Sequence, residues 1–285
     1  VWAFASRVRP ERRAPGGPVP AFPAGGPGDD SRLLRLLHQT ADALVGALDR
    51  LDDWSAPGER PGQYRCDLVA DAVVVECLCA AGLEVWSEES GRQGAAGELL
   101  AVVDPIDGST NAAARLPYYS TSLALLDEAG PRVALVVNLA CGSRYEAVRG
   151  GGARRDGTPL RTSATRSLRD AVVALNGWAP GHLGWRQYRA MGAASLELCA
   201  VAEGALDGYL DLSDSGLAPW DYLGALLVCA EAGAAFCDAD GGELVALGGA
   251  DRRRVVAAAG GELLDELVGA RAGLVRASGA RPKMG

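Results

Sequence analysis

Lysine and histidine are almost absent from this sequence. Its 285 residues include one lysine, Lys283, in a tail rich in glycine and proline, and two histidines, His38 and His182. A phosphate-loop lysine or a Schiff-base lysine in the core is therefore excluded, and so is a zinc site made of several histidines. Neither histidine lies near a Gly-x-Ser-x-Gly turn, as a Ser-His-Asp triad of that kind would require. Carboxylates, hydroxyls and arginines remain to carry chemistry.

Long hydrophobic runs are also missing. Glycine, charged or turn residues interrupt every apolar stretch before it reaches the ~20 residues that a membrane-spanning helix needs. The net charge is −8, which disfavours non-specific binding to nucleic acid or to an anionic membrane. We therefore expect neither partner, and an anionic substrate would need a local source of positive charge. Bound metal cations would supply it.

Paired cysteines are not evident either. The cysteine count is seven, an odd number, and no Cys-x-x-Cys pair occurs. Most of these residues stand among apolar neighbours, as in Leu198-Cys199-Ala200. We interpret them as small buried hydrophobic residues in a reducing cytoplasm.

The chain divides by composition into a leader, one domain and a tail. Residues 1–30 are rich in proline, glycine and arginine, which predicts a disordered leader without the apolar core of a secretory signal. A single domain is expected over 31–275, with halves 31–165 and 166–275, followed by a flexible tail at 276–285.

Periodicity predicts helices over 31–54 (with Ser31 as N-cap), 67–81, 193–203, 220–232 and 262–270, and strands near 85 and over 99–103, 120–126, 132–139, 144–148, 171–175, 207–211 and 255–259. Residues 150–157 are predicted as a turn. Without a regular βαβ repeat, this pattern favours a layered α/β fold with sheets sandwiched by helices.

The stretch from Val102 to Asn111 carries most of the chemical information. An apolar strand ends at Asp104, and Pro105 is expected to stop further pairing because it lacks an N–H. Asp107 follows three residues after the first aspartate, and Gly108-Ser109-Thr110 then predicts the start of a short helix, whose free N–H groups attract anions. Carboxylates are the hard ligands that Mg²⁺ prefers. Taken alone, however, Asp-Pro and Asp-Gly also suit an ordinary loop.

Two further acidic segments could complete such a site. Glu88 and Glu89 follow a short predicted strand, and Asp221 stands after Trp220 at the start of an apolar helix. Each has a simpler interpretation: adjacent glutamates are commonly a solvated loop, and an aspartate at a helix start commonly stabilises that helix.

Taken together, these segments resemble the inositol monophosphatase family of Mg²⁺-dependent, lithium-sensitive phosphatases. Ser87-Glu88-Glu89-Ser90 is similar to the family's Gly-Glu-Glu-Ser motif, Asp104-Pro-Ile-Asp-Gly-Ser109-Thr to its Asp-Pro-Ile-Asp-Gly-Thr-Thr, and Trp220-Asp221 to its Trp-Asp. Three further likenesses lie at 150–160, 189–194 and 231–234, and all six motifs occur in the family's order over roughly residues 31–270. The resemblance implies the α-β-α-β-α sandwich of the inositol monophosphatase and fructose bisphosphatase type, and a homodimer.

The resemblance also implies roles for individual residues. Two or three Mg²⁺ ions would be held by Glu88, Glu89, Asp104, the Ile106 carbonyl, Asp107 and Asp221. Phosphate and substrate would be bound by Asp107, Gly108, Ser109, Thr110, Ala194 and Asp211. Glu88, Ser109 and an aspartate would act in catalysis, with Ser109 and that aspartate orienting the attacking water. Asp67 is favoured as this aspartate by its spacing from Glu88, and Asp71 is its competitor.

The sequence departs from the family in places that concern the substrate. Serine replaces threonine at Ser109 with the hydroxyl preserved, the family's early lysine is missing, and the segments 176–189 and 211–221 differ in length.

The predicted reaction is hydrolysis of a small phosphomonoester: inositol phosphate or a related sugar or polyol phosphate. Histidinol phosphate, a 3′-phosphoadenosine nucleotide, fructose bisphosphate or a pathway-specific nucleoside phosphate are the alternatives. A ligand-binding protein on a phosphatase fold is the non-enzyme alternative. A dehydrogenase has only Gly150-Gly151-Gly152 in its favour.

Overall fold

A computed structural model describes residues 27–248 and 251–279 of the chain. Most of the predicted leader, 1–26, and the last residues of the predicted tail, 280–285, lie outside these ranges. The helices are α1 (Pro27–Leu48), α2 (Arg65–Ala80), α3 (Ser109–Ala113), α4 (Ala194–Ala202), α5 (Pro219–Ala232) and α6 (Gly261–Gly279).

The strands form two sheets. The larger one has the order β2-β1-β3-β4-β5-β6-β7-β8, in which only β1 and β3 pair in parallel. Its strands are β1 (Glu84–Ser87), β2 (Gly91–Gln93), β3 (Leu100–Asp107), β4 (Ser120–Asp127), β5 (Gly130–Asn138), β6 (Arg144–Val148), β7 (Gly152–Arg155) and β8 (Thr158–Pro159). The smaller sheet has the order β10-β9-β11-β13-β12. Its strands are β9 (Val172–Gly177), β10 (Gln187–Arg189), β11 (Gly208–Leu212), β12 (Ala235–Asp238) and β13 (Val255–Ala258).

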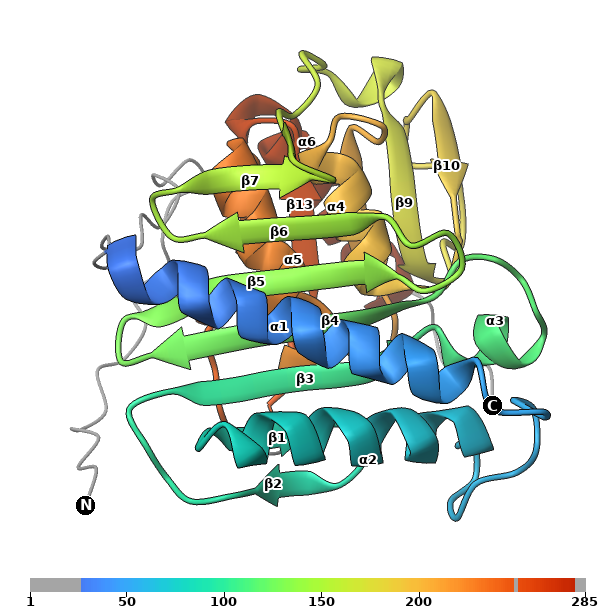
Figure 1. Cartoon of the computed structure of the whole chain (residues 1–285). Helices are drawn as coiled ribbons and strands as arrows, with labels where there is room; N and C mark the ends of the chain where they lie inside the picture. The colour runs from blue at the N-terminus through green and yellow to red at the C-terminus, as the bar shows by residue number, and fades with distance from the viewer. Residues whose placement is uncertain (1–26, 249–250, 280–285) are drawn as a thin grey trace.

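Helices and sheets alternate as five layers (Figure 1). Helices α1 and α2 cover one face of the larger sheet, and α4 and α5 lie between the two sheets. Helix α6 packs on the outer face of the smaller sheet, against β11, β12 and β13. The predicted α-β-α-β-α sandwich is therefore confirmed.

Strand periodicity explains why the larger sheet is covered on both faces. In β3, Ala101 and Val103 pack beneath α1 and α2, whereas Val102 between them faces the central layer of α4 and α5. Because successive side chains of a strand point to opposite faces, a continuous apolar run is what a doubly covered sheet requires. The same alternation occurs in β13, where Val255 contributes to the central core and Val256 to the core beneath α6.

Helix α1 begins earlier than the sequence predicted. Pro27 is its first residue, so Ser31 lies inside the helix and is not its N-cap. Proline is accommodated in a first helical turn, where Asp29 and Asp30 also complement the helix dipole. Asp30 is buried and accepts a hydrogen bond from Arg132 Nε of β5 at 2.7 Å, which attaches the start of the helix to the sheet.

Two strand predictions also need correction. Strand β3 continues through Pro105 to Asp107. The missing N–H of Pro105 is tolerated there because β1 pairs only as far as Val103 and the pairing with β4 shifts register between Asp104 and Asp107. Residues 150–157 are not only a turn, since β7 pairs with β6 between two short turns. At the other end of the chain, α6 extends to Gly279 and so into the predicted flexible tail.

No helix in the described ranges combines the length and apolarity that a bilayer crossing requires.

Candidate metal centre

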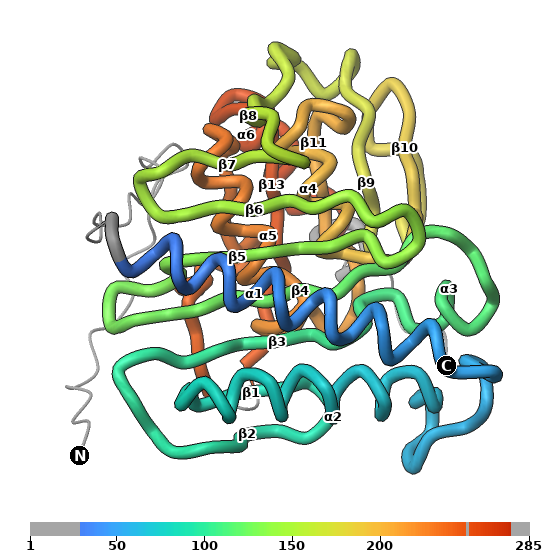
Figure 2. The backbone as a smooth tube through the Cα atoms, viewed as in Figure 1, coloured from blue at the N-terminus to red at the C-terminus, as the bar shows by residue number. Residues whose placement is uncertain are grey.

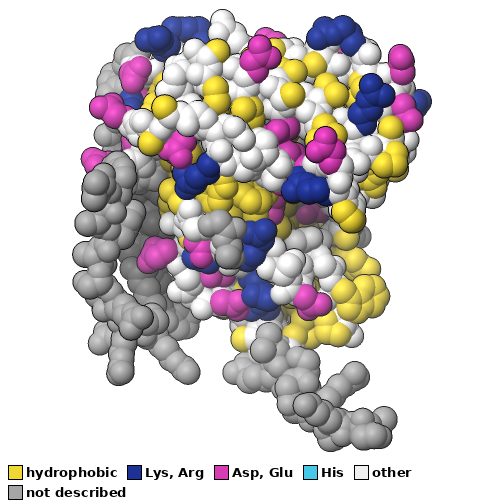
Figure 3. All heavy atoms as spheres, turned by 90° about the horizontal axis from the view of Figure 1, so that it is seen from below, with side chains coloured by type: hydrophobic (Ala, Val, Ile, Leu, Met, Phe, Trp, Pro, Cys, Tyr) yellow, Lys and Arg dark blue, Asp and Glu magenta, His cyan; other side chains and the backbone are white. Residues whose placement is uncertain are grey.

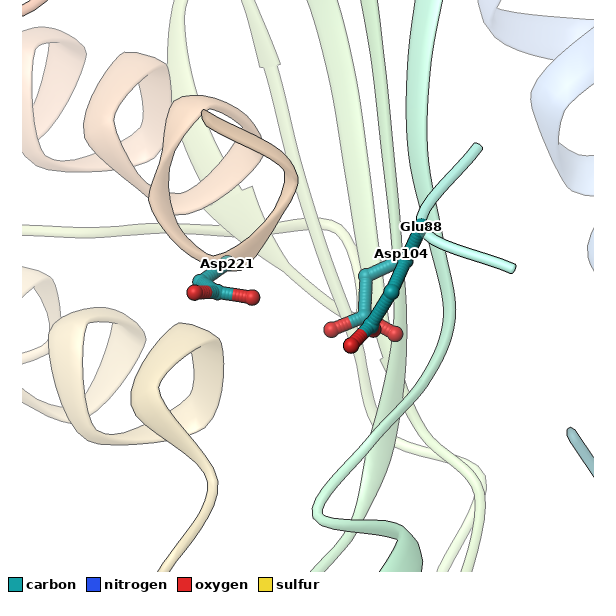
Figure 4. A group of neighbouring side chains, drawn as sticks. All are labelled: Glu88, Asp104 and Asp221. Atoms are coloured by element: carbon teal, nitrogen blue, oxygen red, sulfur yellow. The ribbon is translucent and has the colours of Figure 1, made fainter. Parts of the chain in front are cut away.

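Three carboxylates from three separate segments converge at one end of the larger sheet. Glu88 follows β1, Asp104 lies in β3 and Asp221 lies in the first turn of α5. One oxygen from each lies within 4.8 Å of the others. Figure 4 shows the Glu88 and Asp104 side chains next to each other, with Asp221 facing them from the helix.

Strand pairing places the first two carboxylates. The parallel register aligns Ser87 with Val103, and Glu88 N donates a hydrogen bond to Val103 O at 3.2 Å. The residues that follow this last pair, Glu88 and Asp104, are consequently neighbours.

Two local features place Asp221. Its Oδ2 accepts a hydrogen bond from Ala218 N at 2.7 Å, so the carboxylate caps its own helix, and within the described ranges its other oxygen accepts no hydrogen bond. Three residues later, Gly224 lets α5 approach β4 closely: an added Cβ would stand 2.7 Å from Ser122 Oγ. A larger residue at this position would push the helix, and with it Asp221, away from Asp104.

The clustered carboxylates resist ionisation. Burial, followed by the charge of Glu88, raises the pKa of Asp104 well above its ordinary value. Burial and the charge of Glu89 raise the pKa of Glu88 to about 7, and burial and the charge of Glu88 raise the pKa of Asp221. Within the described ranges, the buried Asp104 Oδ1 has no hydrogen-bond partner. A cation among these oxygens would offset the repulsion and occupy the unpartnered atom, so the donor set fits a hard divalent ion.

Asp107 lies beside this cluster and binds the start of α4. It accepts hydrogen bonds from Ala194 N at 3.2 Å, from Ser195 N at 2.8 Å and from the Ser195 hydroxyl. Burial raises its pKa to about 6, and its charge in turn raises the pKa of Glu88 and of Asp221. Asp107 thus joins the end of β3 to α4 and adds negative charge next to the three clustered carboxylates.

Glu89 turns toward the loop that precedes α2. Its carboxylate accepts hydrogen bonds from Arg60 and Gln63, and its charge raises the pKa of both Glu88 and Asp67. The glutamate pair is therefore divided: Glu88 faces Asp104, and Glu89 links the 56–65 loop to the cluster.

The two competing aspartates of α2 have different neighbours. Burial raises the pKa of Asp67, and a hydrogen bond from Tyr64 N at 2.8 Å, together with the nearby Ser109 side chain, offsets part of this rise. Asp71 instead accepts hydrogen bonds from Ser87 Oγ at 2.5 Å and Ser90 Oγ at 3.2 Å. Asp67 consequently stands next to the Ser109 hydroxyl, whereas Asp71 holds the segment that carries Glu88 and Glu89.

The turn before α3 is tightly packed. Gly108 has φ 87°, and an added Cβ would lie 3.0 Å from Gly192 O. Both the positive φ and the contact select glycine here. The Ser109 hydroxyl donates to Ile106 O at 3.0 Å, and Thr110 follows in the first turn of α3.

Asp211 lies on β11 in the smaller sheet. Its Oδ1 accepts hydrogen bonds from Asn176 Nδ2 at 3.1 Å and Ser213 N at 2.8 Å, and its buried Oδ2 has no partner among the described residues. Burial raises the pKa of this carboxyl. Ala194, the other residue predicted for the alcohol side, is buried at the start of α4 and bound to Asp107.

Sequence reasoning missed two residues that support this region. Glu197 on α4 is buried and accepts a hydrogen bond from Met191 N at 2.7 Å, which holds the 191–193 segment over Gly108. Asn111 Nδ2 donates to Met191 O at 2.7 Å from the other side. An isolated acid in the apolar run 194–202 is a signal that could have identified Glu197.

Comparison with known proteins shows which family the chain belongs to. The inositol monophosphatase family profile matches residues 67–276, and the chain therefore belongs to the inositol monophosphatase family. It is 31% identical over 255 residues to the Nus factor SuhB of Escherichia coli K12, covering 82% of this chain and 91% of that protein. It is 30% identical over 208 residues to the fructose-1,6-bisphosphatase/inositol-1-monophosphatase of Thermococcus kodakarensis, covering 71% and 80%. The crystal structure of SuhB from Bartonella henselae superimposes with a TM-score of 0.73 at 25% identity, covering 84% of this chain and 98% of that one.

Proposed function

We propose that this protein hydrolyses a small phosphomonoester with Mg²⁺ as cofactor. The observation that carries the proposal is the convergence of Glu88, Asp104 and Asp221 within 4.8 Å, with a buried oxygen of Asp104 left without a partner in the described part of the chain. Membership of the inositol monophosphatase family supports the same reaction class.

The residues present would hold more than one ion. Glu88, Asp104 and Asp221 are the proposed core ligands, Asp107 and the Ile106 carbonyl are proposed to complete the shell, and Glu89 is proposed to act through water. When bound, Mg²⁺ supplies Lewis-acid stabilisation of phosphoryl oxygens and makes water more acidic. As in related family members, we expect inhibition by Li⁺ and a homodimeric assembly.

The chain's own groups are proposed to position the reactants. Backbone N–H groups of Gly108 and Ser109, with Thr110 beside them, bind phosphoryl oxygens at the start of α3. The Asp67 carboxylate and the Ser109 hydroxyl hold the attacking water by hydrogen bonds, so that its oxygen forms the new P–O bond as the ester P–O bond breaks. The attacking water loses a proton to solvent and the departing alcohol oxygen gains one from solvent, so the products are the free alcohol and inorganic phosphate. Phosphoryl transfer requires mainly such positioning and electrostatic stabilisation.

The alcohol half of the substrate is proposed to lie between Ala194 and Asp211. If substrate binding uncovers it, the buried and unpartnered Oδ2 of Asp211 can accept a hydrogen bond from a substrate hydroxyl, which favours a polyol or sugar phosphate such as inositol phosphate. A histidinol, nucleoside or 3′-phosphoadenosine phosphate is the alternative that a substrate panel would separate.

A non-enzymatic role is the second candidate. It is favoured by one observation: the Escherichia coli relative, which covers most of this chain, is named a Nus factor. For this chain, a binding role would be compatible with the same fold, and it would extend the expected partners beyond a small phosphorylated substrate.

The decisive experiment measures phosphate release from a panel of phosphomonoesters, with Mg²⁺, with EDTA and with added Li⁺. We expect Mg²⁺-dependent turnover of at least one polyol or sugar phosphate. Asp104→Asn should abolish it, whereas Asp170→Asn, a matched change of an exposed carboxylate in the 168–170 turn, should leave it unchanged. If the folded protein hydrolysed no member of the panel with Mg²⁺, the binding role would replace the enzyme proposal.

A further inference from the structure

Two sequence motifs that the proposed reaction does not use meet at the far end of α5. Glu231, in the last turn of the helix, accepts hydrogen bonds from Gly150 N at 2.8 Å and from Gly152 N at 2.9 Å. These contacts fasten the turn before β7 to the helix. Asp221 and Glu231 are ten residues apart on α5, so ~15 Å of helix separates this turn from the metal centre. Figure 2 shows β7 and β8 at the opposite edge of the larger sheet from β1 and β2.

A groove of about 660 Å³ lies beside this turn. We call it the arginine groove; it is formed by residues 151–154, 159–164, 166 and 230–233. Three of these residues are arginines, Arg154, Arg161 and Arg166, and one is acidic, Glu231. Both carboxylate oxygens of Glu231 already accept backbone hydrogen bonds, so the acid is engaged by the turn.

Among the described residues, the three arginines have no acidic partner. Within residues 27–248 and 251–279, none of them forms an ion pair, and Arg154 and Arg166 donate only to the nearby carbonyls of Gly157 and Thr165, each at 3.3 Å. An adjacent smaller groove contains Arg155, which pairs with Glu203 at 2.7 Å. On the face seen in Figure 3, basic and acidic side chains likewise lie among one another. With three arginines and one acid, the arginine groove is a local excess of positive charge on a chain whose net charge is −8.

The groove has the chemistry of a site for a phosphorylated small molecule. It is an open surface groove of about 660 Å³ and not an enclosed pocket. Guanidinium groups offer several N–H donors in a planar fork that matches phosphate oxygens. No aromatic side chain lines the groove in the described part of the chain, so a nucleobase would have no ring to stack on.

We propose that the arginine groove binds a small ligand carrying a diphosphate or two phosphoryl groups, at a site separate from the metal centre. The three guanidinium groups contact its oxygens, and Glu231 holds the glycine turn that forms one wall. This site is independent of the proposed hydrolytic reaction, because no residue of the carboxylate cluster lines it.

Titration calorimetry with inorganic pyrophosphate in EDTA tests the proposal. Without metal, the carboxylate cluster repels anions, so binding at the catalytic end is suppressed. We expect the unmodified protein to bind one pyrophosphate, and Arg154→Gln/Arg161→Gln to weaken binding about 10-fold or more. Arg35→Gln, which removes one exposed arginine from α1, is the control for general charge and should bind normally.

Three results would overturn the assignment. The first is no pyrophosphate binding in EDTA, and the second is equal affinity in the double variant and the unmodified protein. The third is a single-stranded RNA that binds more tightly than pyrophosphate and loses its binding in the double variant, because the groove would then read a nucleic acid backbone. Circular dichroism and thermal unfolding of each variant establish that the changes act on binding rather than on folding.

Discussion

Trp86 and Trp220 meet edge to face, with ring centroids 5.2 Å apart and an interplanar angle of 88°. Trp86 stands two residues before Glu88, and Trp220 directly precedes Asp221. Arg92 and Arg252 lie over the two rings, 4.9 and 5.5 Å from the respective centroids. The aromatic pair therefore joins two of the segments that carry the carboxylate cluster.

Trp220→Ala should weaken both the fold and Mg²⁺ binding. Loss of the aromatic pair alone is worth about 0.5–1.5 kcal/mol beyond the buried area, and the start of α5 would be held less firmly against β1. Urea unfolding and Mg²⁺ titration measure the two effects. Trp178→Ala removes a tryptophan that is 82% exposed and should change neither. Unaltered Mg²⁺ affinity in Trp220→Ala would show that the pair does not position Asp221.

Gly224→Ala should destabilise the protein by about 1–3 kcal/mol, because its methyl group would stand 2.7 Å from Ser122 Oγ in a closely packed layer. The displaced helix should also lower Mg²⁺ affinity. In the double variant Gly224→Ala/Ser122→Ala the next contact is Val136 Cγ2 at 3.6 Å, so stability should largely return. Additive losses in the double variant would contradict this account.

Asp67→Asn and Asp71→Asn should have different kinetic effects. At position 67 the substitution removes the charge next to Ser109, and we expect turnover to fall about 100-fold with Mg²⁺ affinity preserved. At position 71 the asparagine carbonyl can still accept the hydroxyls of Ser87 and Ser90, which donate to one oxygen of the present carboxylate. Turnover should then remain near normal. Steady-state kinetics and Mg²⁺ titration decide, and the reverse order would assign the water-orienting role to Asp71.

The metal-free protein should lose stability as the pH rises. Burial raises the pKa of Glu88 to about 7 and of Asp107 to about 6, and the pKa of Asp104 and of Asp221 is raised as well. The folded state therefore binds more protons than the unfolded state above pH ~4, and the free energy of unfolding decreases toward pH 8.

Saturating Mg²⁺ should stabilise most at high pH, because protons compete with the ion for these carboxylates. Thermal unfolding at pH 5, 6, 7 and 8 with Mg²⁺ and with EDTA measures the difference in Tm. It should grow with pH and disappear in Asp104→Asn. A difference that is constant with pH would mean that Mg²⁺ does not bind at the titrating cluster.

Much of the fold could be predicted from local pattern. Apolar runs such as 120–126 and 132–139 indicate strands because both faces of the larger sheet are covered, and the helix at 220–232 follows from its apolar length. Short strands were harder to find: β12 has four residues and β2 has three, too few for a clear period. The boundary errors at Ser31 and Pro105 arose where a tertiary contact, Asp30 with Arg132 and β3 with β4, extends an element beyond its local signal.

By itself, the sequence determined the family, because its motifs occur in the family's order along the chain, and it predicted Glu88, Asp104 and Asp221 as metal ligands from the chemistry of those motifs. Only the tertiary structure decided how the neighbouring acids are divided: Asp67 faces Ser109, Asp71 holds Ser87, Asp107 binds the start of α4, and Glu231 fastens a distant turn. Each of these contacts depends on the register of strands and the approach of helices far apart in the chain. A single sequence shows which side chains can accept a hydrogen bond, but packing determines which donor reaches them.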